Sequence, residues 1–285
     1  MSKTIFITGT STGFGKLMVK TLSNAGHTVI AGMRNPTGKN AAAAAELSQL
    51  PNIEVVDIDI TSDESVTKAF EGVLKNHKSI DVLVNNAGVT GFGLLEGYSL
   101  DQVQKMFNTN FYGVLRTYKA VLPAMRKNKS GLIINITTGA SAHTLPFMVP
   151  YFASKIAVES ITEGYQEELR QFNIENVTIQ PGVYPTEMTN GSKSGVNADL
   201  EPVVTAYGEI ATAQFTGMAT AMFGKMAQFN MNPQTIADGV LALVNMKSGT
   251  RPLRYPLDAI AQGTDIEFIK ARADIKAKWL AKYSN

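Results

Sequence analysis

The segment Thr4-Ile5-Phe6-Ile7-Thr8-Gly9-Thr10-Ser11-Thr12-Gly13-Phe14-Gly15 decides which fold this sequence predicts. An apolar run leads into a glycine-rich turn, and apolar residues then recur at helical spacing from Leu17 to Leu22. Glycine adopts backbone angles that are closed to other residues, and the N–H groups at a helix N-terminus attract a pyrophosphate. The segment therefore predicts a strand, a turn and a helix that together bind a nucleotide. The candidate contacts are Gly9, Ser11, Thr12, Gly13, Phe14 and Gly15.

The alternation of strand and helix continues along the chain. Apolar strands that alternate with amphipathic helices are typical of a doubly wound parallel sheet with helices on both faces. We therefore predict an α/β fold in which residues 1–285 form a single domain. The expected strands lie at residues 28–31, 53–56, 81–84, 132–136 and 177–179, and helical patterns cover residues 41–50, 62–76 and 99–127, the last with a kink at Pro123.

The pattern changes between residues 188 and 232, where a polar loop precedes a weakly helical stretch rich in Met and Phe. Methionine adapts its shape, so this stretch can act as a lid over an apolar substrate. An ordinary helix that faces the core explains the same pattern. A final strand and a closing helix are expected within residues 250–283.

Composition excludes several classes of protein. The 285 residues are 44% hydrophobic and carry a formal net charge of +2 without a long basic block, which argues against nucleic-acid binding. The chain has no cysteine and three histidines, so no cluster of metal ligands is expected. The N-terminus lacks a signal-peptide pattern, and no apolar run reaches the ~18 residues that span a bilayer. We expect a soluble, cytoplasmic protein.

The end of the second strand favours NADP as the cofactor. A site that prefers NAD places an acidic residue about 20 residues after the glycine turn, where it binds the ribose hydroxyls. No Asp or Glu occurs between Met1 and Ala45, and the strand is followed by Arg34. The Arg34 guanidinium can bind a 2′-phosphate through two hydrogen bonds, although a solvated loop arginine is the alternative.

The candidate chemistry lies in the middle of the chain. Tyr151 and Lys155 share one face of a predicted helix. A nearby ammonium lowers the pKa of a phenol, so Tyr151 can exchange a proton with a substrate oxygen. Thr138 follows the strand at residues 131–136 and can donate to the same oxygen. The small residues of Asn85-Asn86-Ala87-Gly88 let a cofactor approach the end of another strand.

These motifs, in order, resemble those of the short-chain dehydrogenase/reductase family. The motifs are Thr8-Gly9-x-x-x-Gly13-x-Gly15, Asn85-Asn86-Ala87-Gly88, Asn110, Tyr151-x-x-x-Lys155 and Pro181-Gly182-x-x-x-Thr186. The resemblance implies a Rossmann-type sheet of about seven strands, a homodimer or homotetramer, and hydride transfer between a nicotinamide and an alcohol or carbonyl carbon. It makes Tyr151 the acid/base. By the same resemblance, Lys155 also holds the nicotinamide ribose, and Asn110 supports a water relay.

The resemblance also implies contacts along the cofactor. It places Asp59 and Ile60 at the adenine, Asn86, Ala87 and Gly88 at the ribose, and Pro181, Gly182, Tyr184 and Thr186 on the nicotinamide side.

The family's catalytic serine corresponds to Thr138, which keeps the hydroxyl but has a more restricted rotamer. We expect activity to survive, with Ser141 as the alternative donor. The rival hypothesis is a catalytically silent NADP-binding sensor or scaffold. A hydrolase is disfavoured, because Gly9-x-Ser11-x-Gly13 matches a nucleophile elbow but no histidine follows His143.

The expected substrate is a bulky apolar ketone or secondary alcohol. Apolar residues at 145–149, just before Tyr151, offer walls for such a molecule. The candidate substrate contacts are Thr138, Ser141, Tyr151, Tyr184 and Met188.

Overall fold

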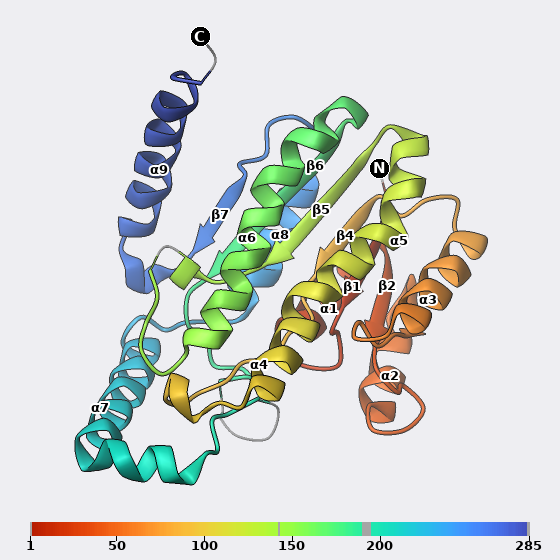
Figure 1. Cartoon of the computed structure of the whole chain (residues 1–285). Coiled ribbons are helices and arrows are strands. Elements are labelled where there is room, and N and C mark those ends of the chain that lie inside the picture. The colour runs from red at the N-terminus through yellow and green to blue at the C-terminus, as the bar shows by residue number, and fades with distance from the viewer. Residues whose placement is uncertain (1, 142, 190–194, 284–285) are drawn as a thin grey trace.

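The computed structural model describes residues 2–141, 143–189 and 195–283. Within these residues a seven-stranded parallel sheet has the order β3-β2-β1-β4-β5-β6-β7 (Figure 1), as predicted. The strands are β1 (Thr4–Thr8), β2 (Thr28–Met33), β3 (Ile53–Asp57), β4 (Val82–Asn85), β5 (Gly131–Ile136), β6 (Ile174–Pro181) and β7 (Arg254–Leu257).

Helices cover both faces of the sheet, and each face has its own core. Strand β1 is buried on both sides, which is why Ile5, Phe6 and Ile7 form a continuous apolar run. Phe6 stacks on Phe70 at 4.4 Å between ring centroids, on the face opposite to Ile7. One face packs on α1 (Gly13–Asn24), α2 (Ala41–Ser48) and α8 (Gln234–Asn245), and the other on α3 (Asp63–Asn76), α5 (Gly113–Asn128) and α6 (Val149–Leu169).

The long helix predicted at residues 99–127 is interrupted. Helix α4 (Leu100–Phe107) begins with a capping box at Ser99, and a π-helical turn at Asn108–Tyr112 separates it from α5. Pro123, where a kink was predicted, lies inside α5, which continues to Asn128. π-Helical turns inside helices are frequent at functional sites.

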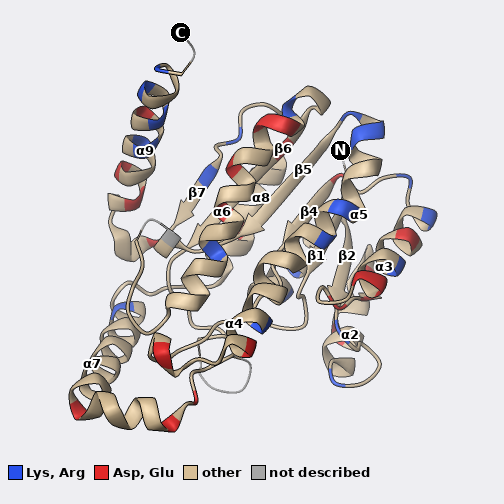
Figure 2. Ribbon diagram, viewed as in Figure 1, with Lys and Arg blue, Asp and Glu red and all other residues tan. Residues whose placement is uncertain are grey.

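Helix α7 (Glu201–Gln228) occupies the segment predicted as a lid. Gly208 has φ +70° and divides it into two helical parts, which stand away from the sheet in Figure 1. Few charges lie on α7 (Figure 2), and most of its residues are exposed, although Met226 reaches the core. The alternative of an ordinary core helix therefore does not describe α7. Residues 190–194 of the predicted lid lie outside the described residues.

The C-terminal region contains β7 and α9 (Thr264–Leu280), as predicted for residues 250–283. Helix α9 projects beside β7 (Figure 1). Among the described residues, no helix is both long and apolar enough to cross a membrane.

Candidate active site

The strand order places the site at the carboxyl ends of the central strands. Strands β1 and β4 are neighbours, and the sheet extends from them in opposite directions, to β2 on one side and to β5 on the other. The connections at such a point leave in opposite directions, which opens the crevice where α/β sheets bind ligands. The predicted site residues at 9–15, 86–88 and 138 follow β1, β4 and β5, and those at 181–186 begin at the last residue of β6, all at this edge.

Two of the three glycines around the turn between β1 and α1 are required by packing, and the third is not. A methyl group on Gly9 would lie 2.7 Å from Ala87 Cα, and one on Gly15 would lie 2.1 Å from the Gly9 carbonyl oxygen. These two glycines are therefore required by chain packing. A methyl group on Gly13 would meet its nearest neighbour, Glu187 Oε2, at 3.5 Å, an ordinary van der Waals distance, so Gly13 is favoured by its φ of +52° rather than by packing.

Thr8 and Asn86 join the glycine turn to the end of β4. The Thr8 hydroxyl oxygen accepts hydrogen bonds from the backbone N–H groups of Asn86 and Ala87, each at 3.1 Å. Asn86 Nδ2 donates to the carbonyl oxygens of Thr8 at 2.9 Å and Gly9 at 3.0 Å. The Asn86 side chain thus holds the turn in place, a role that its position after β4 did not reveal.

Asn110 lies on the π-helical turn and is 1% exposed. Its Oδ1 accepts from Val89 N at 2.8 Å, and its Nδ2 donates to Val89 O and to Ser154 Oγ, both at 2.9 Å. Asn110 therefore connects the segment after β4 to α6. A methyl group on Gly88 would lie 3.1 Å from Asn110 Oδ1 and 3.3 Å from Lys155 Nζ, so these three residues meet.

Tyr151 and Lys155 lie in the first part of α6, and Lys155 reaches the end of β5. Lys155 Nζ donates to the carbonyl oxygen of Ile136 at 2.9 Å, and burial lowers the pKa of Lys155 to about 8. Burial raises the pKa of Tyr151 to about 12. The expected lowering of the Tyr151 pKa by Lys155 is therefore not found, because desolvation of the phenolate dominates.

Thr138 lies two residues beyond β5 and is nearly buried. Its Oγ1 accepts a hydrogen bond from Ala140 N at 3.3 Å, which leaves the hydroxyl proton for another acceptor. Ser141 ends the short 3₁₀ helix Gly139–Ser141, and only its backbone is described.

The segment after β6 is held by the segment after β7. Gly182 N donates to Leu257 O at 2.9 Å, and a methyl group on Gly182 would lie 2.3 Å from the Asp258 carboxyl group. Burial raises the pKa of Asp258. A side chain on Gly182 would therefore clash with Asp258, and the spacing of residues in the sequence did not indicate that these two are neighbours. Pro181 ends β6, and Thr186 N donates to Thr189 Oγ1 at 2.9 Å.

The residues predicted at the adenosine end differ in exposure. Arg34 is exposed just beyond β2. The Asp57 carboxylate at the end of β3 accepts from Asn35 N at 2.9 Å, so an acid does lie near Arg34, contributed by a strand that the spacing argument did not consider. Asp59 Oδ1 accepts from Thr61 N at 2.9 Å and from its hydroxyl at 2.7 Å, and Ile60 is buried.

Tyr184 is not positioned as a substrate contact. It is 3% exposed, its hydroxyl donates to Leu257 O at 2.9 Å, and its ring packs edge-on against Phe14. We correct its predicted substrate role, because core packing occupies the side chain. Met188 is half-buried. Phe147 packs against Phe215 of α7 at 5.5 Å between ring centroids, which joins the predicted lid to the loop before Tyr151.

The described residues contain no group of three or more His, Cys, Asp or Glu side chains that could hold a metal ion. The buried Glu159, which hydrogen-bonds Thr137 at 2.5 Å, was missed in the sequence. Its only signal there is a position eight residues after Tyr151, two turns along the same helix.

Comparison with known proteins agrees with this architecture. Residues 3–197 match the family model described as short chain dehydrogenase. Human retinol dehydrogenase 8 is 34% identical over 260 residues, which cover 88% of this chain and 79% of that protein. The 3-ketodihydrosphingosine reductase of Bacteroides thetaiotaomicron is 37% identical over 186 residues, which cover 65% of each chain and so less than two thirds of that relative's length. A crystal structure of a short-chain dehydrogenase from Streptomyces avermitilis has a TM-score of 0.75 at 25% identity, with 100% of this chain and 97% of that chain covered.

Proposed function

The chain belongs to the short-chain dehydrogenase family, a family of oxidoreductases, and we propose that it transfers a hydride between NADP(H) and an apolar carbonyl compound or secondary alcohol. The observation that carries the proposal is that Lys155 Nζ, one helix turn after Tyr151 on α6, donates to Ile136 O at the carboxyl end of β5, two residues before Thr138.

The residues around the glycine turn fit a dinucleotide. Helix α1 begins at Gly13, and the side chain of Thr12 makes no capping hydrogen bond, so the first N–H groups of the helix can bind a pyrophosphate. Gly13 has no side chain, so a phosphate can approach the backbone there. Ser11, Phe14 and Ala87 lie around this turn, and Gly88, beside Lys155, would contact the nicotinamide ribose.

The other cofactor contacts predicted from the sequence remain proposals. Arg34 would bind the 2′-phosphate, Asp59 and Ile60 would flank the adenine, and Pro181, Gly182 and Thr186 would border the nicotinamide. NADP is favoured because Arg34 is exposed, so its guanidinium is available to a 2′-phosphate.

The nicotinamide supplies or accepts the hydride when it is bound. In reduction, Tyr151 donates its phenolic proton to the carbonyl oxygen, and the phenol is protonated at neutral pH because its pKa is about 12. Thr138 donates its hydroxyl proton to the same oxygen and stabilises the charge that develops there. Lys155 contributes a positive charge next to the site, and Asn110 connects α6 to the segment after β4, where we propose the water relay.

The substrate is proposed to be a large apolar molecule. Phe147, in the loop before Tyr151, packs on Phe215 of α7, so apolar side chains join this loop to the predicted lid. Met188 remains a proposed contact, and two relatives are named for retinol and for 3-ketodihydrosphingosine. A silent NADP-binding scaffold is less well supported, because the Thr138 hydroxyl can still donate. The cytoplasmic location and the homodimer or homotetramer also remain predictions.

The test uses purified protein with NADPH and follows absorbance of the reduced nicotinamide. The probes are retinal, 3-ketodihydrosphingosine, aryl ketones and a small charged keto acid. Tyr151→Phe should lower kcat by about 10³-fold and leave the NADPH Kd within about twofold, because it removes the proton and little volume. Tyr165→Phe, on the same helix, is the matched control. Turnover of the charged keto acid alone would contradict the apolar substrate, and an active Tyr151→Phe variant would contradict the mechanism.

A further inference from the structure

The carboxylate of Glu159 takes no part in the chemistry proposed above, yet it lies on the catalytic helix. Tyr151, Lys155, Glu159 and Glu163 follow one another at four-residue steps along α6. Glu159 is 2% exposed. A charge at this depth is costly unless it is paired and hydrogen-bonded. Its partners therefore indicate what it is for.

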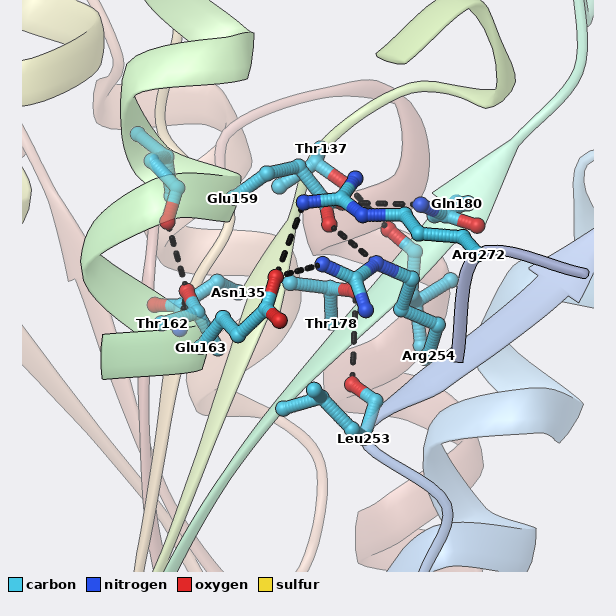
Figure 3. Close-up of polar contacts among 12 residues, drawn as sticks. Asn135, Thr137, Glu159, Thr162, Glu163, Thr178, Gln180, Leu253, Arg254 and Arg272 are labelled. Carbon is cyan, nitrogen blue, oxygen red and sulfur yellow. Dashed lines mark hydrogen bonds and ion pairs between the residues drawn. The ribbon is translucent and has the colours of Figure 1, made fainter. Parts of the chain in front are cut away.

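Three donors from three strands hold the Glu159 carboxylate (Figure 3). Oε1 accepts from Thr137 Oγ1 at 2.5 Å and from Gln180 Nε2 at 3.0 Å. Oε2 accepts from Arg254 Nε at 3.1 Å. Thr137 follows β5, Gln180 lies on β6 and Arg254 on β7. One carboxylate thus joins α6 to three neighbouring strands.

The contact with Thr137 reaches the groups that we propose to react. Thr137 directly precedes Thr138, and Lys155 Nζ holds the carbonyl oxygen of Ile136 on the other side. Helix α6 therefore contacts residues 136–138 at two points, and Thr137 also donates to Ile179 O of β6, from its N at 2.9 Å and its Oγ1 at 3.1 Å. Because Tyr151 belongs to the same helix, these two contacts tie the backbone next to Thr138 to the helix that carries the phenol.

Glu163 belongs to the same ion-pair cluster but contacts other partners. Its Oε2 accepts from Arg254 Nη2 at 2.5 Å and from Arg272 Nη2 at 2.8 Å, and Lys276 pairs with its Oε1. Arg272 and Lys276 lie on α9, so Glu163 joins the C-terminal helix to α6 (Figure 3 shows the contacts of Arg254 and Arg272). Its partners in the described chain are cations, whereas those of Glu159 include Thr137.

We infer that Glu159 is a positioning residue for the reaction: its carboxylate, oriented by Arg254, holds Thr137 so that Thr138 and Tyr151 donate to one substrate oxygen. The inference rests on the proposed function. Glu159 touches neither the substrate nor the cofactor positions, and it acts through the backbone that Thr137 shares with Thr138.

The test compares Glu159→Gln with Glu163→Gln. Glutamine offers one acceptor oxygen to three donors, so Glu159→Gln should lower kcat about tenfold and leave KM and the NADPH Kd within about twofold. Glu163→Gln removes the same charge four residues away, and it should lower Tm with kcat kept within about twofold. Equal losses of kcat in the two variants would overturn the inference.

Variants of Thr137 test the same contact from its other side, should Glu159→Gln fail to fold. Thr137→Val should lower kcat about tenfold, and Thr137→Ser should restore it. The double variant of Glu159→Gln and Thr137→Val should have a kcat no lower than that of the less active single variant, because both substitutions break the same contact between Glu159 and Thr137. Losses that multiply in the double variant would overturn the inference.

Crystal structures separate this inference from the proposed function. Thr138 should move relative to Tyr151 in Glu159→Gln and keep its place in Glu163→Gln. An unmoved Thr138 in Glu159→Gln would overturn the positioning role. If the wild-type protein reduces none of the carbonyl probes while Thr138 moves as expected, the proposed function fails and the positioning of Thr138 by Glu159 stands.

Discussion

Replacing Lys155 by methionine should make this protein more stable and remove its activity. The Lys155 side chain is buried, and its ammonium donates to Ile136 O at 2.9 Å. Burial lowers its pKa from 10.5 to about 8. A catalytic cation held at this depth carries a cost in folding free energy, since its charged form is better solvated in the unfolded chain.

The size of that cost follows from the pKa difference. A folded pKa of about 8 against 10.5 in the unfolded chain penalises the folded state by about 3 kcal/mol at pH 7. Methionine removes the charge but leaves the Ile136 carbonyl without its donor, which costs about 1–2 kcal/mol. The net gain in unfolding free energy is about 1–2 kcal/mol, or an increase in Tm of roughly 3–6 °C.

The gain should depend on pH in a defined direction. The unfolded chain binds more protons than the folded chain between about pH 8 and 10.5, so wild-type stability rises with pH in this window. The Lys155→Met variant lacks this contribution. Its advantage over wild type should therefore shrink by about 2 kcal/mol between pH 7 and pH 9.5.

Urea unfolding followed by circular dichroism at pH 7 and pH 9.5 measures both effects. Lys119→Met, at an exposed position on α5, controls for the loss of a lysine. A Lys155→Met variant that unfolds at lower urea than wild type at pH 7 would refute the cost assigned to the buried charge. So would an advantage that grows toward pH 9.5.

Three further outcomes concern the cofactor and the reaction. Wild-type protein should bind NADPH at least tenfold more tightly than NADH, a difference of about 1.4 kcal/mol, and Arg34→Asp should reverse the preference in a fluorescence titration; equal wild-type affinities would contradict the role of Arg34. Thr138→Ala should lower kcat by about 10²-fold while Thr138→Ser keeps it, and the opposite order would assign the donor to Ser141. The kcat/KM for NADPH, which reports ionisations of the free enzyme, should fall above about pH 8 as Lys155 loses its proton; a flat profile to pH 9.5 would contradict this.

The sequence by itself determined the features that depend on short-range spacing. Strands buried on both faces of a parallel sheet need continuous apolar runs, so segments such as residues 4–7 were recognisable. The four-residue step between Tyr151 and Lys155 places both on one helix face in any fold that keeps the helix. The ends of β1, β4 and β5 meet at one edge because parallel strands share their direction.

Tertiary structure alone decided which partners each residue has. Gly15 is required because the Gly9 carbonyl lies against it, and Tyr184 is buried because Phe14 and Leu257 surround it. The pKa of Tyr151 is raised because packing removes water from its phenol, and Glu159 is paired because β5, β6 and β7 converge on α6. The spacing of residues in the sequence predicts only what happens within one helix turn or one strand. Burial and hydrogen-bond partners arise between segments that are distant in the chain, and they exist only once the elements pack.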